Sequence, residues 1–167
     1  MSQRDLSRVS QDDLLHLCSR TLYTIDGLWF IEVEKKYGFD VAMEIDTEVW
    51  RQLCLIEGKR VKQFFDIDEA SPVRAVMSII QHDPLWTVFH PRVVELSDNK
   101  AVFRFADCPP QEARARDGKP PLPCRKLGQV MYQSYCDVVD PRIKISCVTC
   151  PPDPHPPEYW CEWRLDL

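Results

Sequence analysis

The chain has 167 residues, of which 44% are hydrophobic and 28% are charged, and its formal net charge is -5. This length and composition are typical of one globular domain that buries its own core, so we expect residues 1–167 to form a single domain. The negative charge argues against nucleic acid as a partner, and no apolar run approaches the ~20 residues of a membrane span, so we expect no membrane contact either.

Cysteine and proline are unusually common in this chain. It contains eight cysteines, and 14 prolines stand against five glycines; six of the cysteines follow residue 107. The first residues, Met1 to Asp5, are charged and lack the apolar stretch of a secretory signal, so we expect a cytoplasmic protein. In a reducing compartment, clustered thiols more often bind a metal or react than form disulfides.

A long amphipathic helix is predicted near the start of the chain. Ser10 is a predicted N-cap, and the helix is expected to run from about Gln11 to Tyr37, where Gly38 stops it. Glu32 projects within the apolar stripe of this helix, so it is expected either to find a buried partner or to reach water where the stripe leaves the core. The stripe is expected to face the core and consists of Leu14, Cys18, Leu22, Ile25, Trp29 and Val33.

A second helix is expected to begin at a cap formed by Asp40 or Asp46. Glu57 lies on its apolar face and Arg60 near the edge of that face, which predicts an i,i+3 ion pair. If the two helices form an antiparallel hairpin, Glu32 and Glu57 approach Arg60 together, either as a buried network or as the polar wall of a pocket.

After a short helix that begins at Ser71-Pro72 and ends at Asp83-Pro84, the pattern changes from helices to strands. The elements predicted after residue 84 are a β-hairpin over 85–96 and 101–107, a helix over 124–138, and a second hairpin over 142–149 and 159–167. The sequence therefore predicts an α+β fold. In this fold an N-terminal helical layer (1–84) packs on an antiparallel sheet of about four strands, with a helix between the two hairpins (85–167).

The cysteines at the ends of these elements predict a shared site. Cys147 and Cys150 form a CxxC pair, whose spacing lets two thiols reach one ion. Sulfur and imidazole ligands favour a soft ion, so zinc or iron is the expected cofactor. The alternative is that Cys147 packs in the sheet while Cys150 and His155 lie in a surface loop. The expected metal ligands are Cys108, Cys124, Cys147, Cys150, Cys161 and His155.

A cysteine-dependent reaction is a second hypothesis. Cys124 opens a predicted helix, and thiols at helix N-termini have lowered pKa values, so Cys124 is the candidate catalytic thiolate. His155 would act as its base, with Glu32 or Asp153 as the acid. The cysteines expected to be small apolar fillers instead are Cys18, Cys54 and Cys136.

A pocket for a small ligand is indicated by the tryptophans near these cysteines. Trp29, Trp160 and Trp163 are expected to supply apolar walls and Glu32 a polar one. We therefore favour a domain that binds a metal or a small ligand over an enzyme. A third hypothesis is a structural cysteine-rich core whose exposed aromatic surface binds a partner protein or a second copy of the chain.

Several longer motifs resemble a known family. They are Asp26-Gly-Leu-Trp-Phe30, Cys108-Pro-Pro-Gln111, Asp140-Pro-Arg-Ile-Lys144, Cys150-Pro-Pro-Asp-Pro-His155 and Trp160-Cys-Glu-Trp163. Together they resemble an uncharacterised family of small cytosolic proteins from bacteria and archaea, a likeness that covers nearly the whole chain. This family has no activity that could be carried over.

A more distant resemblance concerns Cys108, Cys124, Cys150 and Cys161 with Trp163. Their order is similar to that in aminothiazoline-carboxylate hydrolase-like proteins and in 4-vinyl reductase-type ligand-binding domains. The likeness implies an α+β sheet that holds a small molecule, and a hydrolase acting on a small cyclic amide or thiazoline. The proline-rich loop of this chain replaces a short glycine turn of those proteins.

Overall fold

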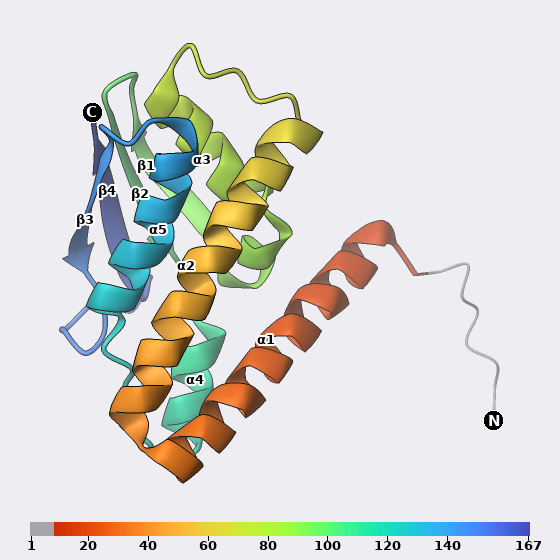
Figure 1. Cartoon of the computed structure of the whole chain (residues 1–167), viewed down its shortest axis with the longest axis vertical. Helices are drawn as coiled ribbons and strands as arrows, with labels where there is room; N and C mark the ends of the chain where they lie inside the picture. Colours follow the sequence, from red (N-terminus) through yellow and green to blue (C-terminus); the bar gives the residue numbers. More distant parts are fainter. Residues whose placement is uncertain (1–8) are drawn as a thin grey trace.

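The computed structural model describes residues 9–167 and has the α+β architecture that the sequence predicts (Figure 1). The charged first residues, from which a cytoplasmic location was inferred, lie outside this range. Within it, no helix is long and apolar enough to cross a membrane. The elements are α1 (Gln11–Tyr37), α2 (Phe39–Phe64), α3 (Pro72–His82), the 3-10 helix η2 (Pro84–Phe89), β1 (Pro91–Leu96), β2 (Lys100–Phe105), α4 (Pro109–Arg116), α5 (Cys124–Val139), β3 (Lys144–Thr149) and β4 (Cys161–Asp166).

Local sequence signals set the ends of the first helices. Ser10 forms a capping box at the start of α1: its hydroxyl accepts a hydrogen bond from the Asp13 backbone N–H, and its own N–H donates to Asp13 Oδ2, both at 3.0 Å. Gly38 ends α1 as predicted, with φ 92°, and α2 follows directly. Because Gly38 itself precedes α2, the prediction that Asp40 or Asp46 caps this helix is wrong.

The four strands form one antiparallel sheet in the order β1-β2-β4-β3. Both predicted hairpins are present, and β4 joins them by pairing with β2. Pro91 begins β1, an edge strand, which suits a residue that has no backbone N–H. β1 and β3 are therefore the edge strands, and β2 and β4 lie between them.

One face of the sheet carries the core. Phe103 and Phe105 in β2 and Trp163 and Leu165 in β4 are buried, and the residues that alternate with them are polar or partly exposed. The helices α3 and α5 contact the strands, α2 packs against α5, and α1 packs against α2 and η2. The helix α1 thus lies farthest from the sheet, and it diverges from α2 toward its N-terminal end (Figure 1).

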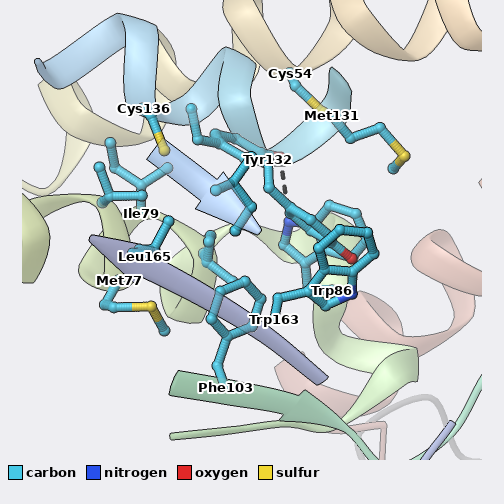
Figure 2. Packing of buried hydrophobic residues seen from close by; sticks show 14 of the residues in the cluster. Cys54, Met77, Ile79, Trp86, Phe103, Met131, Tyr132, Cys136, Trp163 and Leu165 are labelled. Carbon is cyan, nitrogen blue, oxygen red and sulfur yellow. Dashed lines mark hydrogen bonds between the residues drawn. The ribbon is translucent and has the colours of Figure 1, made fainter. Parts of the chain in front are cut away.

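Aromatic side chains fill the centre of this core (Figure 2). Tyr132 of α5 stacks on Phe105, with 5.8 Å between the ring centroids, and meets Trp163 edge-on at 4.9 Å. The Trp163 ring lies directly on Gly128, where a Cβ atom would come within 2.4 Å of the indole. The absence of a side chain at Gly128 therefore lets α5 approach the sheet closely.

The segment Pro84–Phe89 forms the 3-10 helix η2, so the prediction of a strand beginning at residue 85 is wrong there. Asp83 accepts a hydrogen bond from the Leu85 backbone N–H at 2.9 Å, and Pro84 occupies the first helical position. A short apolar run fits a strand and a buried helix equally well. The Asp-Pro start, which favours a helical turn, decides between them here.

The helix α1 has the predicted length but a different buried side. Its buried residues are Ser19 and Tyr23. The stripe predicted to face the core is exposed instead: Leu14 and Ile25 are each 51% exposed and Trp29 is 71% exposed. Apolar residues occur on both sides of this helix, so their helical period alone does not reveal which side meets the rest of the protein.

Candidate functional site

Cysteines from separate segments lie at one end of the sheet. Cys161 begins β4 and is paired with Phe105 at the end of β2, and Cys108 follows β2 at the start of α4. Cys124 begins α5, and its backbone N–H donates to the Pro151 carbonyl at 3.0 Å, which holds it against the loop after β3. The topology thus brings Cys108, Cys124 and Cys161 into the same region.

These three cysteines line a cavity of about 570 Å³ between the helices α1, α2, α4 and α5 and this end of the sheet. Pockets for small organic ligands commonly have this size and a mostly apolar lining. The aromatic residues of the lining are Tyr23, Phe30, Trp50, Trp86, Phe89, Phe105, Tyr132 and Trp163.

A second hollow of about 610 Å³ lies beside Trp86, His90 and Asp107. It is more open to solvent, and two of its titratable groups, His90 and Asp107, are already paired, because His90 Nδ1 lies 2.5 Å from Asp107 Oδ2. This pair is about half exposed, which leaves little reason for a ligand to displace it. We therefore place the candidate site in the more enclosed cavity.

Two carboxyls from adjacent helices stand out among the charged residues that line the cavity, because burial shifts the pKa of both. The other charged lining residues are Arg20, Asp107, Glu112, Arg114, Arg116, Asp117 and Lys119. Asp26 belongs to α1 and Asp46 to α2. Burial raises the pKa of Asp26 to about 6, although contact with the Trp50 side chain lowers it slightly. Burial, followed by the nearby charge of Asp26, raises the pKa of Asp46 to about 7, and Trp50 again opposes the shift. Near neutral pH the two carboxyls together therefore carry less than their full negative charge.

Two further polar atoms of the lining residues have no partner. Tyr23 Oη and Trp163 Nε1 are buried and have no nitrogen or oxygen partner within residues 9–167, although the Trp163 side chain lies close enough to the Cys161 thiol to lower its pKa. The Tyr23 ring stacks on Trp50 at 5.6 Å and meets Phe89 at 4.9 Å, so its position is fixed by packing. A buried donor without an acceptor costs free energy, and such groups in a cavity wall are expected to bind a ligand or water.

The thiols of the cavity are protonated at neutral pH. Burial raises the pKa of Cys124 to about 11, even though Gln111 Nε2 donates to its Sγ at 2.9 Å. Burial also raises the pKa of Cys161 to about 12 and that of Cys108 far above its usual value. Burial therefore shifts the pKa of Cys124 in the direction opposite to the lowered value expected from its place at a helix N-terminus.

A preformed metal centre is absent from residues 9–167, since no three or more His, Cys, Asp or Glu side chains there lie close enough together to hold an ion. Cys147 and Cys150 interact with each other and do not line the cavity. Zinc or iron therefore stays a prediction that the geometry does not support, as does the metal-ligand role of Cys108, Cys124, Cys147, Cys150, Cys161 and His155.

A family model covers almost the whole chain. Residues 4–167 match the family described as "Family of unknown function (DUF6125)". The chain belongs to this family. Its membership agrees with the resemblance to an uncharacterised family that the motifs indicated. No curated protein and no solved structure matches the chain, so the comparisons provide no evidence for the more distant likeness to the hydrolase-like proteins or the reductase-type domains.

Three of the four predicted ligand-contacting residues lie away from the cavity. Trp29 is exposed on the outer side of α1, and Glu32 forms an exposed ion pair with Lys35 at 2.6 Å, because the buried side of α1 differs from the predicted one. Trp160 packs on His155, with 4.9 Å between the rings, and neither lines the cavity. Trp163 is the predicted wall that does line it.

The predicted cluster of Glu32, Glu57 and Arg60 forms only in part. Glu57 and Arg60 make the expected i,i+3 ion pair, in which the Glu57 side chain is largely buried and that of Arg60 is exposed. Glu32 binds Lys35 instead and takes no part.

The three cysteines predicted to be apolar fillers differ in their burial. Cys54 and Cys136 are buried apolar fillers, as predicted, whereas Cys18 is exposed on α1. Cys150 follows β3 and is buried, so the alternative that placed it in a surface loop is wrong for this residue.

The acidic pair was missed by sequence reasoning. Asp26 lies at the flank of the stripe that was taken as the core face, and Asp46 was interpreted as a helix cap. A usable signal was present: Asp26 shares one helical face with Tyr23 and Phe30, at i-3 and i+4, and this face is the buried one.

Proposed function

We propose that this protein binds a small organic molecule that has a flat apolar body and a protonated amine. The observation that carries the proposal is the pair Asp26 and Asp46, two carboxyls with raised pKa values in the wall of one cavity that also presents eight aromatic side chains. Groups whose pKa is shifted by burial and by a like charge are typical of binding and catalytic sites.

A cation is the ligand group that this pair suits best. Burial and mutual repulsion both disfavour the charged carboxylates, and an ammonium group between them would relieve both effects. A hydrogen bond between charged groups contributes about 1.5–3 kcal/mol, more than one between neutral groups. The pair therefore favours an amine over a neutral or acidic molecule of the same shape.

The aromatic lining suits the rest of the molecule. Tyr23 and Trp50 present a stacked pair, and Trp50 continues to Trp86 with 6.3 Å between the ring centroids. Aromatic walls favour planar ligands and attract cations to their faces. The unpartnered Tyr23 Oη and Trp163 Nε1 supply donors for a ligand acceptor.

Binding is favoured over cysteine catalysis because of the protonation state of the thiols. A nucleophilic cysteine acts as a thiolate, and the pKa of Cys124, about 11, leaves very little thiolate at neutral pH. The predicted base His155 does not line the cavity. As protonated thiols, Cys108, Cys124 and Cys161 are small, polarizable wall residues.

The proposal is tested with three indoles of similar size. Tryptamine carries an ammonium group, tryptophol a hydroxyl and indole-3-propionate a carboxylate. Isothermal titration at pH 8 is expected to rank tryptamine first, and Asp46→Asn is expected to weaken tryptamine binding about tenfold while leaving tryptophol unchanged. Tryptamine affinity is also expected to rise between pH 5 and pH 8, because the carboxyls ionise over this range while an alkyl ammonium stays protonated.

The matched control is Asp137→Asn, which removes an exposed carboxylate on α5 away from the cavity. Equal binding of the three indoles, or an amine preference that survives in the Asp26→Asn/Asp46→Asn double variant, would show that the acidic pair does not select the ligand. Either result overturns the proposal.

A further inference from the structure

The side of α1 that faces away from the protein is apolar over four turns. Its large exposed residues are Leu14, Leu15, Leu17, Leu22, Ile25, Leu28 and Trp29. We infer that this outer face binds the same face of a second copy of the chain, with the two α1 helices antiparallel. The contact does not rest on the ligand proposed above, although Leu28, at the edge of this face, also lines the cavity.

The spacing of the outer face is that of a helix-pairing seam. Leu14, Cys18, Thr21, Ile25 and Leu28 follow one another at intervals of 4, 3, 4 and 3 residues, the a/d pattern of paired helices. Flanking residues on the same side widen the seam. Ser19 and Tyr23, which fix α1 to the protein, lie on the opposite side, so the seam is free to pack against another helix without disturbing the fold.

The size of the exposed face fits an interface. Seven large side chains, each between about two fifths and seven tenths exposed, leave on the order of 700 Å² of mostly apolar surface, more than the largest patch of a typical monomer. A standard protein interface buries ~800 Å² on each partner. Exposed Val41, Ile45, Val49 and Ile56 on α2 add to the apolar surface of the same helical hairpin.

The charges of α1 indicate that the partner is a second copy in antiparallel orientation. The first turn contains Asp12 and Asp13, and the last turn contains Lys36 and Lys35, of which Lys35 already pairs with Glu32. Antiparallel pairing about the middle of the helix places the acidic end of each copy toward the basic end of the other, and it also aligns the helix dipoles favourably. Parallel pairing would bring like charges together. A two-fold contact of this kind closes on itself and gives a dimer.

Sedimentation equilibrium of the full chain tests the contact. The wild-type protein is expected to approach twice the 19.5 kDa mass of one chain at micromolar concentration. Ile25→Glu is expected to raise the dimer dissociation constant at least about a hundredfold, because it places charges in the middle of an apolar interface. Val148→Glu is the matched control, since Val148 is also 51% exposed but lies on β3. Far-UV circular dichroism checks that each variant is folded, and Leu17→Glu provides a second disruption of the seam.

Charge exchange tests the orientation. Lys36→Asp is expected to weaken the dimer about threefold to tenfold, and adding Asp13→Lys, the first-turn acid nearer the seam, is expected to recover the wild-type dissociation constant; far-UV circular dichroism checks that α1 stays helical without the Ser10–Asp13 capping box. A monomeric wild type at 100 µM, or a dimer that Ile25→Glu and Leu17→Glu leave intact, would overturn the interface. A double variant weaker than Lys36→Asp alone would overturn the antiparallel arrangement.

Discussion

The pKa of Asp46, about 7, links the acidic pair to the stability of the fold. In the unfolded chain an aspartate titrates near 3.9, so the folded state binds this proton more tightly. The stabilising contribution is fully present below about pH 4 and is lost as the pH rises through the folded value near 7. Asp26, with a pKa of about 6, acts in the same direction. The pair therefore destabilises the unliganded protein at neutral pH, which is a cost that a cationic ligand would offset.

Replacing Asp46 with asparagine tests this linkage. Asn has the shape of the protonated acid and no titration, so Asp46→Asn is expected to raise the free energy of unfolding by about 1–3 kcal/mol at pH 8 and to leave it nearly unchanged at pH 4. Urea unfolding at a series of pH values measures the difference. Asp137→Asn is expected to show no such pH dependence, and a parallel pH profile for Asp46→Asn and wild type would contradict the assigned pKa.

At the scale of helices, the reversal between α1 and α2 depends on one residue. Gly38 has φ 92° and is the single residue between the two helices; its N–H donates to the Glu34 carbonyl at 2.9 Å, and its carbonyl accepts from Ala42. Residues other than glycine rarely adopt a backbone conformation with this positive φ. Gly27, in contrast, lies within α1, and apart from its chain neighbours and the backbone of its own helix no atom of residues 9–167 lies within 4 Å of the position that its Cβ would occupy.

The two glycines predict opposite effects of the same substitution. Gly38→Ala is expected to lower the free energy of unfolding by about 1–2 kcal/mol, because alanine is strained at positive φ. Gly27→Ala is expected to raise it by about 0.5–1 kcal/mol, because alanine favours the helix and restricts the unfolded chain. Thermal unfolding followed by circular dichroism measures both. Equal effects of the two variants would show that the turn does not require its glycine.

The sequence predicted elements best where a single residue decides the outcome. Ser10 and Gly38 set the ends of α1, and Pro72 and Cys124 begin α3 and α5, all as expected from capping and proline geometry. The segment after Asp83 was predicted wrongly because an apolar run without period does not distinguish a strand from a 3-10 turn. Which side of α1 is buried was also beyond reach, since that depends on the neighbours of the helix and not on its own period.

At the scale of the whole molecule, the order of strands and helices could be predicted but the buried side of each helix could not. This difference explains which site residues were predicted. The positions of Cys108, Cys124 and Cys161 follow from the order of the strands and helices, so chain topology was sufficient to bring them together. Asp26 and Asp46, in contrast, line the cavity because of the sides that α1 and α2 turn toward it. The outer face of α1 is also apolar, and for this reason the periodicity of α1 predicted the wrong buried side. The same outer face is inferred to pair with a second copy of the chain.

Cysteine labelling tests whether α2, in the N-terminal helical part, and α5, in the C-terminal part that contains the sheet, unfold as one cooperative unit. Cys18 is exposed, whereas Cys54 and Cys136 are 0% exposed and burial raises the pKa of each thiol to about 12. Iodoacetamide at pH 8 is therefore expected to modify Cys18 at least about a thousandfold faster than the two buried thiols, which react only when the chain unfolds. Mass spectrometry of peptides over time gives the three rates, and labelling in urea above the unfolding midpoint confirms that all three thiols react when exposed. If Cys54 reacted much faster than Cys136 without denaturant, α2 would open independently of α5, and the two layers would not unfold together.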